Sequence, residues 1–128
     1  MGRAIDIARY ISSICAVDNL KVQKLLYYSQ AVHMVLNNSA SAVLFKDEIQ
    51  AWQYGPVVPS VYHKLKKYGL DNIPASSPKH ELSENEVRSV NMVVDYYGNM
   101  TGTRLINKTH QEEPWKNFYV PNKKNIII

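Results

Sequence analysis

The stretch that decides the fold runs from Leu20 to Leu36 and reads LKVQKLLYYSQAVHMVL. Apolar side chains recur along it at the spacing of one face of an α-helix. That face consists of Val22, Leu25, Leu26, Val32, His33 and Leu36, with Ser29 on the same side. We expect this helix at the centre of the core, with Lys21, Gln23 and Lys24 turned mostly outward.

Further helices are predicted on both sides of this central segment. Upstream, residues 5–15 place isoleucines at helical spacing. Asp18 or Asn19 can then cap the start of the central helix. Downstream, Pro59 suits the first turn of a helix that continues to about residue 68 and ends at Gly69.

The second half of the chain predicts two more helices. Ser83 and Glu86 have the spacing of a capping box, which marks the start of a helix that ends at Gly98. Residues 103–111 form another candidate helix, which Pro114 ends. Prolines and serines in residues 71–79 predict a loop between the two halves.

Residues 45–54 are ambiguous between strand and helix. Apolar and polar side chains alternate there, as in a half-buried strand, but Phe45, Ile49 and Trp52 also fit one helical face. We favour a short strand because Gly55 and Pro56 follow directly. An extended piece around His80 is its expected partner, and residues 55–59 are expected to form a rigid extended turn.

These elements predict a mainly α (α+β) fold. A chain of 128 residues supports one hydrophobic core, so we expect a single compact domain over residues 1–128. It should hold five or more helices, with a small β element near residues 45–52. No apolar run approaches the roughly 18 residues of a membrane span. The single cysteine, Cys15, excludes an internal disulfide, so we expect a cytoplasmic protein.

The positive charge is concentrated in the first half of the chain. Residues 1–69 hold 8 basic and 4 acidic residues, an excess of +4, whereas residues 70–128 hold 7 of each. Lys64, Lys66 and Lys67 form a cluster. Such a cluster can attract nucleic acid or an acidic protein partner, and it also fits an ordinary solvated helix face.

A search for catalytic or metal-binding motifs returns little. The glycines form no phosphate-binding loop, and the four histidines lack the spacing of a metal site. His33 fits a hydrogen-bonded core residue. His110 lies near Glu112 and Glu113, a pattern that acid–base chemistry can use, although neighbours at a helix end usually point apart. We therefore predict no enzyme activity, no metal site and no cofactor.

The aromatic residues indicate a binding surface instead. The chain has nine tyrosines, a residue favoured at protein interfaces because its apolar ring has a polar tip. Two aromatic residues precede a turn stiffened by prolines, which gives a plausible anchor for a partner. The predicted partner-binding residues are Trp52, Tyr54, Pro56, Val57 and Pro59. The alternative is that Trp52 fills the core while the turn only directs the chain.

Three blocks of this sequence resemble a known family. Residues 19–31, NLKVQKLLYYSQA, look like the LKLQKLLYYAQ helix of phage-associated SocA/GepA-like proteins, whose shared domain is also called the Panacea antitoxin domain. Residues 45–59, FKDEIQAWQYGPVVP, resemble the second block of that family, and Thr109, His110, Pro114 and Trp115 match its late Thr-His…Pro-Trp element. The resemblance covers about residues 4–118.

The resemblance implies an antitoxin encoded by a prophage or another mobile element, which neutralises a cognate toxin by binding it. At least one such protein acts as an adaptor that delivers its toxin to a protease, so a protease is a second implied partner. The family brings no catalytic residues. Among the motif residues, Lys24, Gly55, His110 and Trp115 are expected to be structural, with Lys24 bonding a carbonyl or a carboxylate and Trp115 closing the core.

Two alternatives stay open beside the antitoxin. The lysine cluster allows a nucleic-acid-binding regulator of its own operon, and His110 with a neighbouring glutamate allows a hydrolase. The chain finishes on Ile126, Ile127 and Ile128, where similar proteins continue into further helix. We expect either an element that has been cut or one that docks back onto the core.

Overall fold

The computed structural model describes residues 4–38, 42–110 and 126–127. They form helices α1 (Ala4–Ile14), α2 (Asn19–Leu36), α3 (Pro59–Leu65), α4 (Glu84–Tyr97) and α5 (Gly102–His110), with a 3-10 turn η1 (Lys66–Tyr68) after α3. The strands are β1 (Gln50–Trp52), β2 (Gly55–Val57) and β3 (Ile126–Ile127). The predicted mainly helical domain with a small β element near residues 45–52 is confirmed.

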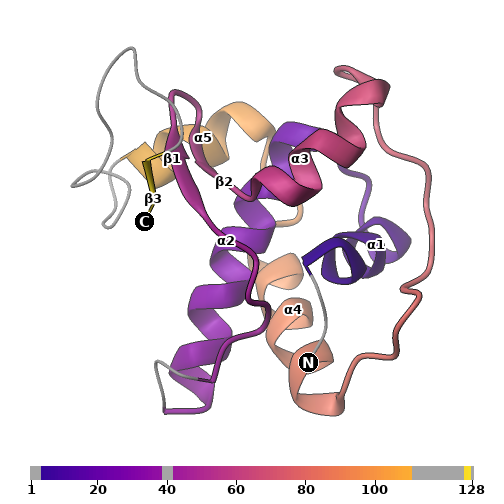
Figure 1. Cartoon of the computed structure of the whole chain (residues 1–128), viewed down its shortest axis with the longest axis vertical. Helices are drawn as coiled ribbons and strands as arrows, with labels where there is room; N and C mark the ends of the chain where they lie inside the picture. The colour runs from indigo at the N-terminus through magenta and orange to yellow at the C-terminus, as the bar shows by residue number, and fades with distance from the viewer. Residues whose placement is uncertain (1–3, 39–41, 111–125, 128) are drawn as a thin grey trace.

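Helix α2 runs through the middle of the molecule, and the other elements pack around it (Figure 1). It contacts α1, α3, α4, α5 and β2. Asp18 caps its start by accepting a hydrogen bond from the Lys21 amide at 2.8 Å, as predicted. The predicted core face is also largely present, since Val22, Leu25 and Leu26 are fully buried. Leu36, at the end of the helix, is exposed instead.

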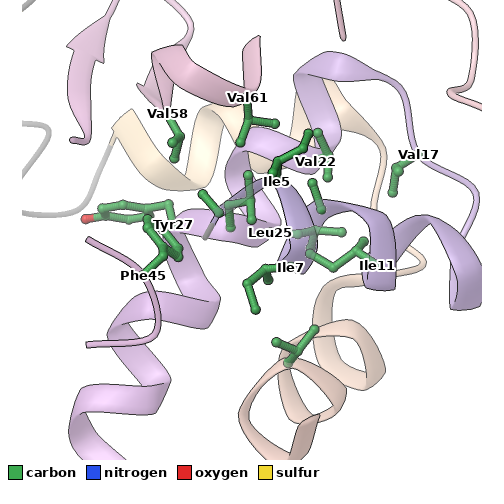
Figure 2. Packing of buried hydrophobic residues seen from close by; sticks show 14 of the residues in the cluster. Ile5, Ile7, Ile11, Val17, Val22, Leu25, Tyr27, Phe45, Val58 and Val61 are labelled. Carbon is green, nitrogen blue, oxygen red and sulfur yellow. The ribbon is translucent and has the colours of Figure 1, made fainter. Parts of the chain in front are cut away.

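The core joins side chains from α1, α2, α4 and α5 and from the chain that leads into α3. Figure 2 shows Ile7 and Ile11 of α1 facing Val22 and Leu25 of α2. On the other side of α2, Phe45 lies against Tyr27 (Figure 2). Phe45 is fully buried although its segment has no regular secondary structure. The irregular chain before β1 is therefore part of the core.

The sheet differs from the prediction in length and in pairing. Strand β1 covers three residues and pairs antiparallel with β2 on one side and β3 on the other. The predicted pairing with residues around His80 is wrong, because β2 directly follows β1 and forms a hairpin with it. The backbone pairing of Ile126 and Ile127 with β1 agrees with the expectation that the C-terminal isoleucines dock back onto the core.

Local capping signals fixed the starts of α3 and α4. Pro59 occupies the first turn of α3, and Gly69 ends η1 with a φ of 60°, which favours glycine. Ser83 and Glu86 form the predicted capping box at the start of α4. The connection from η1 to α4 contains no helix or strand, as predicted, and runs along the outer edge beyond α1 (Figure 1).

A buried carboxylate holds this long connection against α1. Asp6 is fully buried and accepts hydrogen bonds from the Lys79 amide at 2.9 Å and from His80 Nδ1 at 3.1 Å. Arg9 Nη1 donates to it at 3.3 Å. Burial raises the pKa of Asp6, but the hydrogen bonds from Lys79 and His80 outweigh it and leave the pKa below its ordinary value of 3.8.

We expect Asp6→Asn to lower the free energy of unfolding at pH 7 by about 1–3 kcal/mol, because charge-assisted hydrogen bonds are lost. The folded state favours the carboxylate. The Asp6 carboxylate therefore contributes its full stabilisation when the pH is above the pKa that Asp6 has in the unfolded chain. This stabilisation is lost below about pH 4, as the pH falls through the lower pKa of the folded state. Denaturant melts from pH 2.5 to 7 should show the two proteins converging in acid. A constant difference across that range would contradict the role of Asp6.

Candidate protein-binding groove

The turn between β1 and β2 exposes two side chains, those of Gln53 and Tyr54. Trp52 pairs with Gly55 across a turn made by Gln53 and Tyr54. Gly55 has a φ of 100°, a conformation that residues with a Cβ rarely adopt, which explains why glycine suits this position. Tyr54 is 55% exposed and Gln53 is exposed as well. The exposed turn residues are therefore held in place by the paired strands β1 and β2.

Trp52 is neither a core residue nor a free anchor. Its ring is half-buried and meets Tyr62 of α3 edge-on, with 5.0 Å between ring centroids. Its Nε1 donates a hydrogen bond to Gln50 Oε1 at 2.9 Å. These contacts hold the indole in one orientation while part of its surface stays open to a partner.

Two of the predicted partner-binding residues have little surface to offer. Pro56 is buried, and Val57 is only 2% exposed, because β2 packs against α2. Pro59 is half-buried at the start of α3. The surface predicted from the sequence is thus narrower than expected and consists mainly of Trp52 and Tyr54.

These two residues line a groove between the hairpin, the start of α2 and the α3–η1 segment. Its volume is about 360 Å³, and its lining includes Leu20, Trp52, Tyr54, Tyr62, Lys66 and Leu70. Leu70 is 83% exposed. We call this surface the hairpin groove. An exposed leucine, three aromatic rings and one cation suit a protein partner better than a small polar substrate.

Lys24 lies beneath the hairpin and is completely buried, so the expectation that it points outward is wrong. Its Nζ donates a hydrogen bond to the Pro56 carbonyl at 3.0 Å, and this agrees with the expected bond to a carbonyl. Burial lowers the pKa of Lys24 from 10.5 to about 7. The lysine ties α2 to β2 and so fixes one wall of the groove.

Comparison with known families shows which protein family the chain belongs to. Residues 22–116 match the family model described as antitoxin SocA-like, Panacea domain. The chain belongs to this family. No curated protein matches the chain, and no solved structure matches it either.

In this member of the family, the motif helix supports the hairpin through hydrogen bonds to backbone atoms. Gln23 Oε1 accepts from the Val58 amide at 2.8 Å, and Gln30 Oε1 accepts from the Leu44 amide at 2.6 Å. Gln30 Nε2 also donates to the Phe45 carbonyl at 2.8 Å. Gln23, Lys24 and Gln30 of α2 therefore bond main-chain atoms on both sides of β1.

Gln23 and Gln30 are important residues that the sequence interpretation missed. Gln23 was expected to point outward, but it is fully buried, and Gln30 is buried as well. Lys21 is half-buried, and its Nζ donates to the Gly98 carbonyl at the end of α4. The available signal was the central position of the helix, because a helix surrounded on most sides has few outward positions.

The remaining predicted site residues divide into those that the structure describes and those that it does not. His33 is buried, with its Nδ1 2.8 Å from Ser89 Oγ, as expected of a hydrogen-bonded core histidine. His110 is the last residue of α5. Trp115, Glu112 and Glu113 lie outside the described residues, so the acid–base hypothesis for His110 stays a prediction.

The part of the chain that the structure describes contains no cluster of three histidine, cysteine or carboxylate side chains able to hold a metal ion. Within the same residues, no helix is long and apolar enough to span a membrane. Cys15 is half-buried and packs at the edge of the core, less deeply than the sequence suggested.

Proposed function

We propose that this chain neutralises a cognate toxin by binding it directly, and that the hairpin groove is a contact surface. The carrying observation is the groove itself, in which Trp52 is held by Tyr62 and Gln50 while Tyr54 and Leu70 project into solvent. Fixed aromatic side chains lose little conformational entropy on binding, which makes them effective anchors. Membership of an antitoxin family supports a toxin as the partner. In this proposal the chain has a binding role and no catalytic one.

The first experiment is co-expression with the neighbouring gene, on the proposal that a prophage or mobile element encodes the pair. Induction of the neighbouring gene alone should stop growth, and co-expression of this chain should restore it. The two purified proteins should also form a complex in size-exclusion chromatography. A neighbouring gene that is harmless alone, or toxicity that this chain leaves unchanged, would refute the proposal.

The groove is tested by the double variant Tyr54→Ala, Leu70→Ala. Removal of two exposed anchors should weaken toxin affinity at least about tenfold and abolish growth rescue, while the melting temperature stays near that of the wild type. The matched control is Met92→Ala, Tyr96→Ala, which removes two exposed apolar side chains from α4 instead. Equal loss of affinity in both variants, measured by calorimetry, would show that this groove is not the contact surface.

Direct neutralisation and delivery to a protease predict different fates for the toxin. Occlusion should leave the toxin's cellular half-life unchanged or longer, whereas an adaptor should shorten it. A pulse-chase measurement with and without this chain distinguishes the two mechanisms. We propose occlusion as the basic activity, with the adaptor role as an additional step for a bound toxin.

A regulatory role in nucleic-acid binding is the second candidate. Lys64, Lys66 and Lys67 are all exposed on the α3–η1 segment, where a phosphate backbone could reach them. Binding to the promoter of its own operon should then fall steeply as salt increases. The absence of a gel shift at low salt would remove this candidate without affecting the antitoxin proposal.

A further inference from the structure

A second groove lies between α1, the α3–η1 segment and the connection that follows Gly69. Its volume is about 570 Å³, within the range of pockets that hold ligands or several side chains. The floor is apolar and is formed by Ile5, Ala8, Leu65 and Ile73. We call this surface the lysine groove, because Lys64 and Lys67 stand at its rim. The proposed function above makes no use of it.

The outer wall of the lysine groove is held in place by hydrogen bonds to the first part of the chain. The Ile73 amide donates to the Val17 carbonyl at 2.9 Å, and the Ser76 amide donates to Ser12 Oγ at 3.2 Å. Farther along the same connection, Asp6 holds the Lys79 amide. The groove is therefore shaped before any partner arrives, which lowers the entropic cost of binding.

The charged side chains that line the lysine groove are all positive. Lys64 and Lys67 are exposed, and Arg9, the third cation of the lining, already donates to Asp6. The described residues that line the groove include no aspartate or glutamate. The two exposed lysines thus produce a positive potential over an apolar floor, and this favours a ligand that combines carboxylates with an apolar side chain.

A protein segment fits this arrangement better than a nucleic acid does. Single-stranded nucleic acids stack their bases on aromatic faces. Tyr68 is the aromatic residue among the described lining residues, and Lys67 Nζ already lies 5.3 Å from its ring centroid. A hydrocarbon floor made by Ile5, Leu65 and Ile73 gains more from an apolar side chain than from a base or a phosphate.

We propose that the lysine groove binds an acidic segment of the cognate toxin, whose carboxylates face Lys64 and Lys67 while an apolar side chain packs over Ile5 and Ile73. This inference rests on the proposed function, since it assumes that the partner is a toxin. It adds a second contact surface, whose lining shares no residue with the hairpin groove, and it states the chemistry of the toxin segment.

The charge is tested with Lys64→Glu, Lys67→Glu in the full chain and the purified product of the neighbouring gene as the probe. Toxin affinity at low salt should fall about tenfold or more, and the difference from wild type should shrink as salt increases. The control Lys46→Glu, Arg88→Glu makes the same change in net charge at exposed cations outside the groove. An equal loss of affinity in both pairs would overturn the inference.

The shape is tested separately with Ser76→Trp, which leaves every charge in place. Ser76 is exposed and lines the groove, and its backbone amide makes the hydrogen bond to Ser12, so the side chain can change without loss of that bond. The tryptophan should block the apolar floor and reduce toxin affinity about tenfold. Ser77→Trp is the control, because the neighbouring serine is exposed and lies outside the lining.

The outcomes separate this inference from the proposed function. If wild-type protein binds the toxin and neither groove variant differs from its control, the inference is wrong and the antitoxin proposal stands. If wild-type protein binds no toxin, both fail. If the lysine variant loses binding to operon DNA while its toxin affinity is unchanged, the groove is a nucleic-acid surface and the inference is overturned.

Discussion

Between pH 7 and pH 10, the free energy of unfolding should rise for the wild-type protein and stay nearly level for Lys24→Met. Lys24 is fully buried with its Nζ on the Pro56 carbonyl, and burial lowers its pKa from 10.5 to about 7. In this pH range the unfolded chain binds the proton that the folded chain has released. Stability therefore increases with pH by up to about 1.4 kcal/mol per pH unit, and the increase ends near the unfolded pKa.

Urea melts at half-unit pH intervals measure this dependence. Methionine is an unbranched apolar side chain of similar length without a titrating group, so it should remove the Lys24 contribution while still filling the space. Lys46→Met changes an exposed lysine and should keep the wild-type slope. If Lys24→Met retained that slope as well, another group would have to titrate in this range, and Lys24 would be protonated throughout.

Phe45→Ala should lower the free energy of unfolding by about 3–5 kcal/mol, a large part of the total stability of a small domain. Phe45 is fully buried beside Tyr27 (Figure 2). Its backbone carbonyl accepts a hydrogen bond from Gln30 Nε2. The substitution leaves a cavity that neighbouring side chains cannot fill completely. The same measurement on Tyr96→Ala, an exposed aromatic on α4, should give a change below about 1 kcal/mol.

A small effect of Phe45→Ala would show that residues 42–49 separate easily from α2. In that case the hairpin would not be rigidly seated, and the hairpin groove would lose its main support as a preformed surface. Hydrogen exchange of the Leu44 amide, which donates to Gln30, offers an independent check because its protection reports local opening.

Local signals in the sequence predicted the helices well. The Ser83–Glu86 capping box and Pro59 each marked a helix start, because the groups that satisfy the first amides of a helix lie within a few residues of it. The apolar face of α2 was predicted for the same reason, since residues at helical spacing share a face whatever surrounds them.

Strand pairing and the orientation of polar side chains could not be predicted in this way. The choice between β2 and the His80 region as the partner of β1 depends on which backbone reaches it, and no local pattern encodes that. Polarity likewise placed Gln23 and Lys24 outward, although α2 is enclosed by other elements. Their burial is compensated by hydrogen bonds to Val58 and Pro56, two residues more than thirty positions away.

The candidate site was found only in part. The aromatic tip of the hairpin was visible in the sequence as Trp52 and Tyr54, but Leu20, Tyr62 and Leu70 join the groove through tertiary packing. Pro56 and Val57 looked like surface residues because a proline-stiffened turn is usually exposed. They are buried because this turn becomes a strand packed on α2.

The way α2 holds its neighbour has a consequence for how specificity can change. Gln23, Lys24 and Gln30 form hydrogen bonds with backbone atoms of the segment that includes the hairpin. Backbone atoms do not change when a side chain of that segment is substituted. Exposed residues such as Gln53 and Tyr54 can therefore be substituted without loss of these hydrogen bonds. A few substitutions at exposed positions of the hairpin turn can therefore change which partner binds, while the scaffold stays constant.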